Sequence, residues 1–135
     1  MKILKMKLTL LLALLVFVEL ASGQEAVQNS EDETQCSGNT YDMSVCLSTS
    51  LKKIDAQLND YYRKALKVTK RFTPQDEQNL KAAQKAWLTY RDAACKAEYD
   101  LWGGGSGGPN AHTMCIIRLT KQRSTDLHNA YLQER

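Results

Sequence analysis

The sequence predicts an all-α domain: a three-helix antiparallel bundle of two long helices and a third after a glycine-rich loop, stapled by two disulfides. Three observations predict it. Apolar residues recur at alternating steps of three and four in three segments, the periodicity of helices with one buried face. No run alternates with the period of two that strands require. An even number of cysteines, four, follows a segment typical of export.

Residues 1–23 are predicted to be a cleaved signal peptide. A lysine-rich start precedes 11 apolar residues, "LTLLLALLVFV", which are too few to span a bilayer as a helix. Ala21 and Gly23 then stand three and one positions before a cleavage point ahead of Gln24. An uncleaved anchor is the weaker alternative because no longer apolar stretch follows. We therefore expect export and no stable membrane anchor after cleavage.

Charge is unevenly distributed along the chain that cleavage leaves. The formal net charge falls from +3 to +1, because the signal contains three lysines and one glutamate. Residues 24–42 contain five acidic and no basic residues, whereas the chain from Met43 onward carries a net +6. We expect an acidic, flexible leader at 24–40, one helical domain at 41–135 and no nucleic-acid partner.

The first long helix is predicted from a seam that steps by three and four. Thr73 and Pro74 then suit the N-cap and first position of the second helix, and Asp76 places a carboxylate in its first turn. The expected seam of the first helix is Leu47, Leu51, Ile54, Leu58, Tyr61, Ala65, Val68 and Phe72. That of the second is Leu80, Ala83, Trp87, Tyr90, Ala94, Ala97 and Leu101.

The run "GGGSGGPN" ends the second helix, because its glycines and proline cannot continue one. It lies between helical segments, which favours a native loop. Asn110 is the expected cap of the third helix. Arg123 interrupts a third seam of Ile116, Leu119, Leu127 and Ala130.

The cysteines are expected to form two disulfides rather than a thiolate metal site or a reactive thiol. Their spacings match no C-x-x-C pattern. If the second turn is centred near residue 106, Cys95 faces position 117, within about one turn of Cys115. This favours Cys95–Cys115 with Cys36–Cys46. The alternative, Cys46–Cys95 with Cys36–Cys115, stays open because helices tilt.

A set of polar and aromatic side chains lies on the predicted seams, and it has two interpretations. Facing arithmetic places Arg91 near Asp55, and Arg123 near Trp87 and Tyr90. The first interpretation is a half-buried polar framework of Asp55, Arg91 and Arg123, with the aromatic rings covering the arginine stems. The second is a partner-contacting patch of Trp87, Tyr90 and Arg91, residue types that dominate binding hot spots.

Catalysis is not expected. His112 and His128 are the only histidines, and no catalytic motif surrounds either. Asp55 and Asp92 do not form a carboxylate pair, because helical phase turns Asp92 away from the seam. We expect no catalytic residues, no metal and no cofactor, and a hydrolase is the weakest hypothesis.

A set of residues recurs along the chain in an order typical of one known family: Asp55 with Leu58, Asn59 and Tyr62, Gln84 with Trp87, the Tyr90-Arg91-Asp92 run with Cys95, the Gly104-Gly105-Ser106 loop, Cys115, and Thr120 with Arg123. In this order and spacing, roughly residues 36–131 resemble the lysozyme-inhibitor LprI-like N-terminal domain family. No cysteine directly follows the apolar run of the signal, so lipid anchoring does not carry over from the resemblance.

The resemblance implies a small exported bacterial domain, periplasmic or extracellular, whose partner is a protein such as lysozyme. Either the acidic leader attracts a basic enzyme, or the glycine-rich loop with Ser106, His112 and Arg118 enters a cleft lined by carboxylates. The plainer interpretation of the loop is a connection that turns beside a disulfide. The alternative function is an interaction or envelope-maintenance module without lysozyme inhibition.

Overall fold

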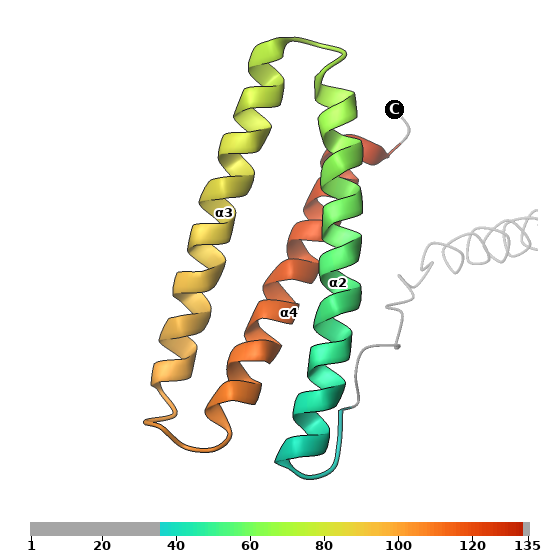
Figure 1. Ribbon diagram of the computed structural model, residues 1–135. Coiled ribbons are helices and arrows are strands. Elements are labelled where there is room, and N and C mark those ends of the chain that lie inside the picture. Colours follow the sequence, from blue (N-terminus) through green and yellow to red (C-terminus); the bar gives the residue numbers. More distant parts are fainter. Residues whose placement is uncertain (1–35, 134–135) are drawn as a thin grey trace, which may run out of the picture. The chain divides into compact units, whose positions relative to one another are not determined.

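The computed structural model describes residues 36–133; the predicted signal peptide and residues 24–35 of the predicted leader lie outside the described residues. Helix α2 spans Thr40–Thr69, α3 Pro74–Asp100 and α4 Gly108–Leu127, and the short π-helix η1, His128–Leu132, continues α4 (Figure 1). Residues 36–133 contain no strand. The predicted all-α, three-helix architecture is confirmed.

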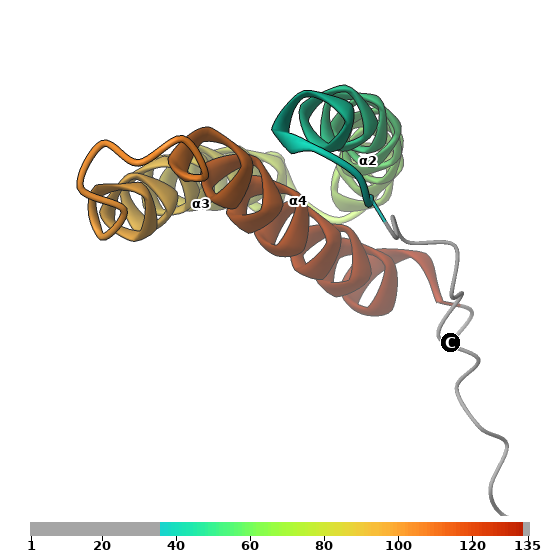
Figure 2. The same cartoon turned by 90° about the horizontal axis from the view of Figure 1, so that it is seen from below.

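Helix α4 joins the other two helices of the domain. It runs obliquely from the C-terminal end of α3 toward the C-terminal part of α2, and it lies between them when the domain is seen from below (Figures 1 and 2). It packs extensively against both, whereas α2 and α3 touch each other little. We call the end with residues 70–73 and η1 the turn end, and the end with residues 101–107 and the start of α2 the loop end.

The turn end contains the main hydrophobic core, to which all three helices contribute. Ala65 and Leu127 are completely buried, and Leu58 and Leu80 nearly so. Burying a leucine side chain stabilises a fold by about 1.5–3 kcal/mol, so this cluster contributes a large share of the packing energy of the domain. The partly buried side chains around it are Tyr61, Tyr62, Leu66, Trp87 and Tyr131.

The predicted start of α3 is confirmed. Thr73 is the N-cap: its hydroxyl oxygen accepts a hydrogen bond from the backbone N–H of Asp76 at 3.2 Å, and the hydroxyl donates to the Asp76 carboxylate at 2.7 Å. Pro74 occupies the first helical position, where its missing N–H leaves no bond unmade. The cap therefore stops α2 and α3 from merging into one helix at this turn.

Both disulfides lie toward the loop end, with the favoured pairing. Cys36 bonds to Cys46 and Cys95 to Cys115, with Cα–Cα distances of 5.6 and 5.5 Å. The second bond joins α3 to α4 inside a small buried cluster with Ile116. The alternative pairing that the sequence left open is thereby excluded.

The start of α4 differs from the prediction. Gly107, without a side-chain bond, takes the N-cap position, and Asn110 lies buried within the first turn. Its side-chain amide donates to the backbone oxygen of Thr40 at 3.1 Å. The helix begins earlier than predicted because Pro109 fits a first turn. This frees Asn110 to join the starts of α4 and α2.

The buried face of α3 also differs from the predicted seam. Gln84 and Arg91 face inward, whereas Tyr90 is 60% exposed. The prediction counted apolar residues only, but α4 supplies hydrogen-bonding partners that make inward polar side chains acceptable. The predicted seam residues that are exposed are Phe72, Ala83, Tyr90, Ala97, Leu101 and Ala130.

Candidate functional site

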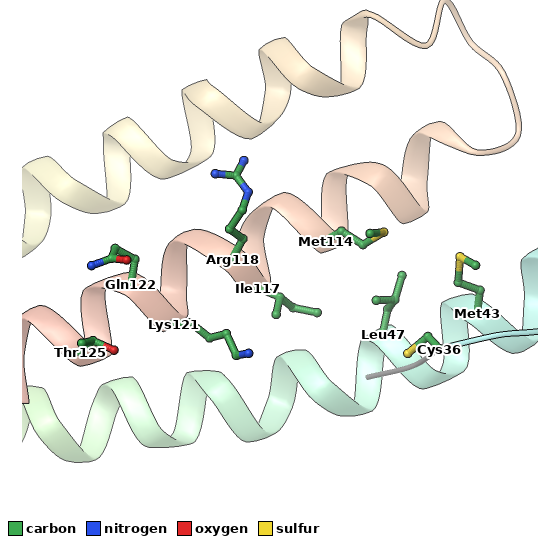
Figure 3. A pocket seen from close by; sticks show the side chains of 9 residues that line it. All are labelled: Cys36, Met43, Leu47, Met114, Ile117, Arg118, Lys121, Gln122 and Thr125. Carbon is green, nitrogen blue, oxygen red and sulfur yellow. The ribbon is translucent and has the colours of Figure 1, made fainter. Parts of the chain in front are cut away.

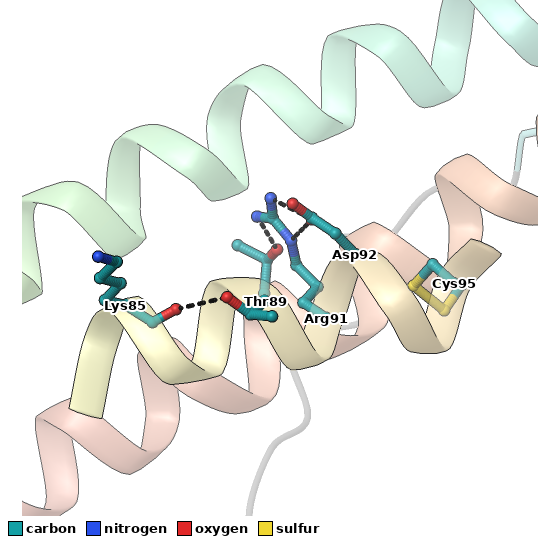
Figure 4. Close-up of polar contacts among 7 residues, drawn as sticks. Lys85, Thr89, Arg91, Asp92 and Cys95 are labelled. Carbon is teal, nitrogen blue, oxygen red and sulfur yellow. Dashed lines mark hydrogen bonds and ion pairs between the residues drawn. A yellow bond between two sulfur atoms is a disulfide. The ribbon is translucent and has the colours of Figure 1, made fainter. Parts of the chain in front are cut away.

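Arg91 is the centre of a polar contact set between α3 and α4 (Figure 4). Its side chain is 16% exposed, and Nε and Nη2 each lie 2.9 Å from Oδ1 of Asp92. Nη1 donates to the hydroxyl of buried Thr120 at 3.5 Å. The guanidinium carbon lies 5.2 Å from the ring centroid of Trp87, a cation–π distance. The Arg91 guanidinium therefore already has hydrogen-bond acceptors and an aromatic ring as partners within the domain.

Arg123 completes this set from α4. Its Nε donates to Oε1 of the buried Gln84 at 2.9 Å, so it binds an amide rather than stacking on a ring. Within residues 36–133, Asp55 forms no ion pair with Arg91 or Arg123. The facing arithmetic assumed that α2 and α3 pack along their length, but their contact is small. The structure therefore brings the two arginines to the α3–α4 interface without Asp55.

The predicted aromatic–arginine patch is not one surface. Trp87 packs against the core of the turn end, and Arg91 is mostly covered. Tyr90 is the only one of the three that projects into solvent among the described residues. Helical phase predicted that Asp92 points away from the seam. The long Arg91 side chain nevertheless reaches the Asp92 carboxylate. A partner approaching this side would meet Tyr90 first.

The loop end presents two adjacent large apolar side chains to solvent. Leu101 is 86% exposed and Trp102 is 52% exposed. The turn that carries them requires glycine, because Gly104 has φ +84°. A Cβ at Gly107 would lie 2.6 Å from the Trp102 ring, so the ring rests directly on backbone. Leu101 was predicted to be a core residue and Trp102 was not predicted to have a role, although an aromatic directly before a glycine run was the available signal.

The predicted loop-end residues lie near this surface but are not equivalent. Ser106 is exposed in the loop. The ring of His112 is half-buried and meets the Tyr99 ring edge-on, with centroids 6.1 Å apart. Arg118 forms an ion pair with Glu98 at 2.5 Å, with both side chains largely exposed. Arg118 was predicted to bind a partner's carboxylates, and in this structure it is already paired with a carboxylate of its own chain.

A groove of about 460 Å³ runs between α2 and α4 toward the loop end (Figure 3). Met43, Leu47, Met114 and Ile117 provide its apolar lining. Lys121 points from α4 toward α2, whereas Arg118 points toward α3. Burial lowers the pKa of Lys121, since desolvation disfavours its charged form.

The described residues contain little that resembles catalytic machinery. No group of three or more His, Cys, Asp or Glu side chains in residues 36–133 gathers to hold a metal ion. Every described cysteine is in a disulfide. None of the described helices has the length and apolarity that crossing a bilayer requires. What this part of the chain offers a partner is surface: the loop-end knob of Leu101 and Trp102, the groove and Tyr90.

Comparison with known proteins gives two matches. The sequence matches the family described as lysozyme inhibitor LprI over residues 30–127. It is also 28% identical over 110 residues to an uncharacterized protein of Rhizobium meliloti (strain 1021), covering 74% of this chain and 79% of that protein. No solved structure matches.

Proposed function

The chain belongs to the lysozyme inhibitor LprI family, and on that premise we propose that it is an exported binding domain that inhibits a lysozyme by occluding the active-site cleft. The loop end is the proposed contact surface. Its knob, Leu101 and Trp102, is the observation that carries the proposal. Tryptophan is enriched among the few residues that supply most of the binding energy in protein interfaces, so Trp102 is the proposed anchor.

The knob is preorganised for binding. Cys95–Cys115 joins the two helices that flank the loop, and the Trp102 ring is seated on Gly107. A surface that is already ordered loses less conformational entropy when a partner binds it. This supports insertion of the loop end into a concave partner.

Charge supplies a second contribution to the proposed contact. Glycosidase clefts carry a pair of catalytic carboxyl groups. Arg118 is 60% exposed although it is paired with Glu98, so a partner's carboxylate can compete for its guanidinium. A surface ion pair of this kind contributes little to stability, which makes the exchange inexpensive. His112, beside the loop, is the proposed hydrogen-bonding neighbour.

The proposed location is the bacterial periplasm or the extracellular medium. Two disulfides within residues 36–133 are typical of proteins that fold in an oxidising compartment. The family is one of inhibitors rather than enzymes by its description, in agreement with a protein partner and with action by binding alone.

The test is a cell-wall clearing assay with c-type, g-type and i-type lysozymes and the oxidised mature protein, with binding measured in parallel. We expect inhibition of at least one class and its loss in the Leu101→Ala/Trp102→Ala double variant. Tyr90→Ala is the matched control, because it removes an exposed aromatic from the middle of α3. No inhibition and no binding at micromolar protein would overturn the proposal and favour the interaction module.

Two further variants locate the contact. Arg118→Ala together with His112→Ala should weaken inhibition if the loop end carries it. Removal of residues 24–35 should leave inhibition intact, whereas a loss would move the contact to the acidic leader. If inhibition survives every loop-end change but is lost with Tyr90→Ala, the contact lies on the Tyr90 face.

A further inference from the structure

The turn end carries a concentration of positive charge that inhibition at the loop end does not use. Residues 61–72, the last part of α2 and the start of the turn, contain five basic and no acidic residues. Such a bias within three helical turns places the charges close together. The basic residues are Arg63, Lys64, Lys67, Lys70 and Arg71.

Only part of this charge is neutralised within the domain. Asp60 pairs with Lys64 at 2.7 Å and with Arg63 at 3.5 Å. Lys70 lies 3.7 Å from Glu77. Lys67 and Arg71 form no ion pair among the described residues.

Lys67 and Arg71 line a shallow groove of about 510 Å³ between α2 and η1. Val68 and Leu132 give it an apolar lining. Tyr61 and His128 also line it, with ring centroids 5.4 Å apart, and Lys64 completes it. The groove therefore presents three cations beside apolar and aromatic side chains.

Phe72 adds an uncovered aromatic ring beside these cations. It follows Arg71 in the turn and is 72% exposed. Cations together with an aromatic at the tip are the combination that favours a lipid–water interface, where the ring enters below the headgroups.

We propose that the turn end binds reversibly to the surface of a bilayer containing anionic phospholipids. Lys67 and Arg71 contact the headgroup phosphates, and Phe72 inserts its ring below them. Each basic residue close to an anionic membrane surface adds to the attraction between the protein and that surface, and salt weakens this attraction. This binding is independent of lysozyme inhibition, since the loop end lies at the other end of the helices and stays accessible (Figure 1).

The experiment is cosedimentation of the oxidised mature protein with vesicles. One set is phosphatidylcholine alone, and the other contains about a third phosphatidylglycerol. We expect binding to the anionic set only, decreasing as salt is raised. The Lys67→Ala/Arg71→Ala variant should lower the partition coefficient by about tenfold or more. Phe72→Ala should weaken binding with the salt dependence kept.

The matched control is Lys52→Ala/Lys53→Ala, which removes the same charge from exposed positions elsewhere on α2. An equal loss in this control, or equal binding to neutral vesicles, would overturn the proposal. Displacement from the vesicles by millimolar inorganic phosphate would assign the groove to a soluble phosphate ligand, and displacement by an acidic peptide would assign it to a protein. Retained lysozyme inhibition in Lys67→Ala/Arg71→Ala separates this proposal from the preceding one.

Discussion

At the loop end, disulfides join the chain segments and the adjacent side chains of Leu101 and Trp102 are exposed. At the turn end, a core of leucine, alanine and aromatic side chains joins the helices, and Phe72 is the exposed aromatic. Cys95 and Cys115 are buried beside one of their few apolar neighbours, Ile116. Leu127 at the turn end is completely buried, and no described cysteine lies near it. The helices are the same three, but the cause of their association differs along their length.

The difference explains how a small domain can present the proposed binding surface. Apolar side chains placed in contact with a partner cannot also stabilise the core. Covalent bonds compensate at the loop end, because a disulfide restricts the unfolded chain whatever the neighbouring side chains do. Leu101 and Trp102 can therefore remain exposed where the chain is covalently joined.

The largest expected effect is at the turn end. Leu127→Ala should lower the free energy of unfolding by about 2–5 kcal/mol, because it leaves a cavity at the centre of the core. Leu101→Ala at the loop end should change it by less than about 0.5 kcal/mol, since that side chain is exposed. Urea denaturation of both variants measures the contrast. Similar losses would show that Leu101 packs into the fold rather than facing solvent.

Removal of the Cys95–Cys115 bond should be the next largest effect. Replacing both cysteines by alanine should cost about 2–4 kcal/mol, and the equivalent Cys36–Cys46 variant should cost less because it closes a shorter loop. Hydrogen exchange should show lost protection around residue 115 and retained protection around residue 65. Uniform loss along α4 would mean that the two ends unfold as one unit.

A smaller effect is expected from Gly107→Ala. The new Cβ displaces the Trp102 ring, because the two would otherwise lie 2.6 Å apart. We expect about 0.5–1 kcal/mol of destabilisation, and a shifted Trp102 indole N–H signal in NMR spectra. The same substitution in a Trp102→Ala background should be nearly neutral. If it costs as much there, backbone rather than the ring sets the constraint.

The smallest expected effect concerns pH at the turn end. A hydrogen bond from Lys81 lowers the pKa of Glu77 below its usual 4.5. A depressed folded-state pKa gives stability that is present above pH 4.5 and is lost as pH falls through the lower folded value. Glu77→Gln should reduce the acid-induced decrease in Tm, with little change at neutral pH because an ion pair whose lysine is exposed to solvent contributes little. An unchanged acid profile would show that this pair does not contribute.

The helices and the disulfide pairing followed from the sequence because each depends on local or nearly local physics. The three–four period, the Thr73 cap and the short path between Cys95 and Cys115 need no knowledge of how the helices tilt. The burial of Gln84 and Arg91 does need it. Those side chains turn inward only because α4 supplies Arg123 and Thr120 as partners.

The candidate site was less predictable for the same reason. Tyr90 and Leu101 are apolar residues at helical spacing, which the sequence cannot distinguish from core positions. Their exposure follows from the oblique path of α4, which covers a different face of α3. Asn110 was expected at a cap, and only the approach of α2 explains its bond to Thr40.

The central position of α4 also determines when the fold can form. Helices α2 and α3 share little contact, so the hairpin that they make has almost no interface of its own. During synthesis, the N-terminal two thirds of the domain therefore emerge without a partner for their apolar faces. Cooperative folding waits for the last helix, which completes both interfaces at once. Because α4 is the last helix to be synthesised, we expect the domain to stay unfolded until its synthesis is nearly complete.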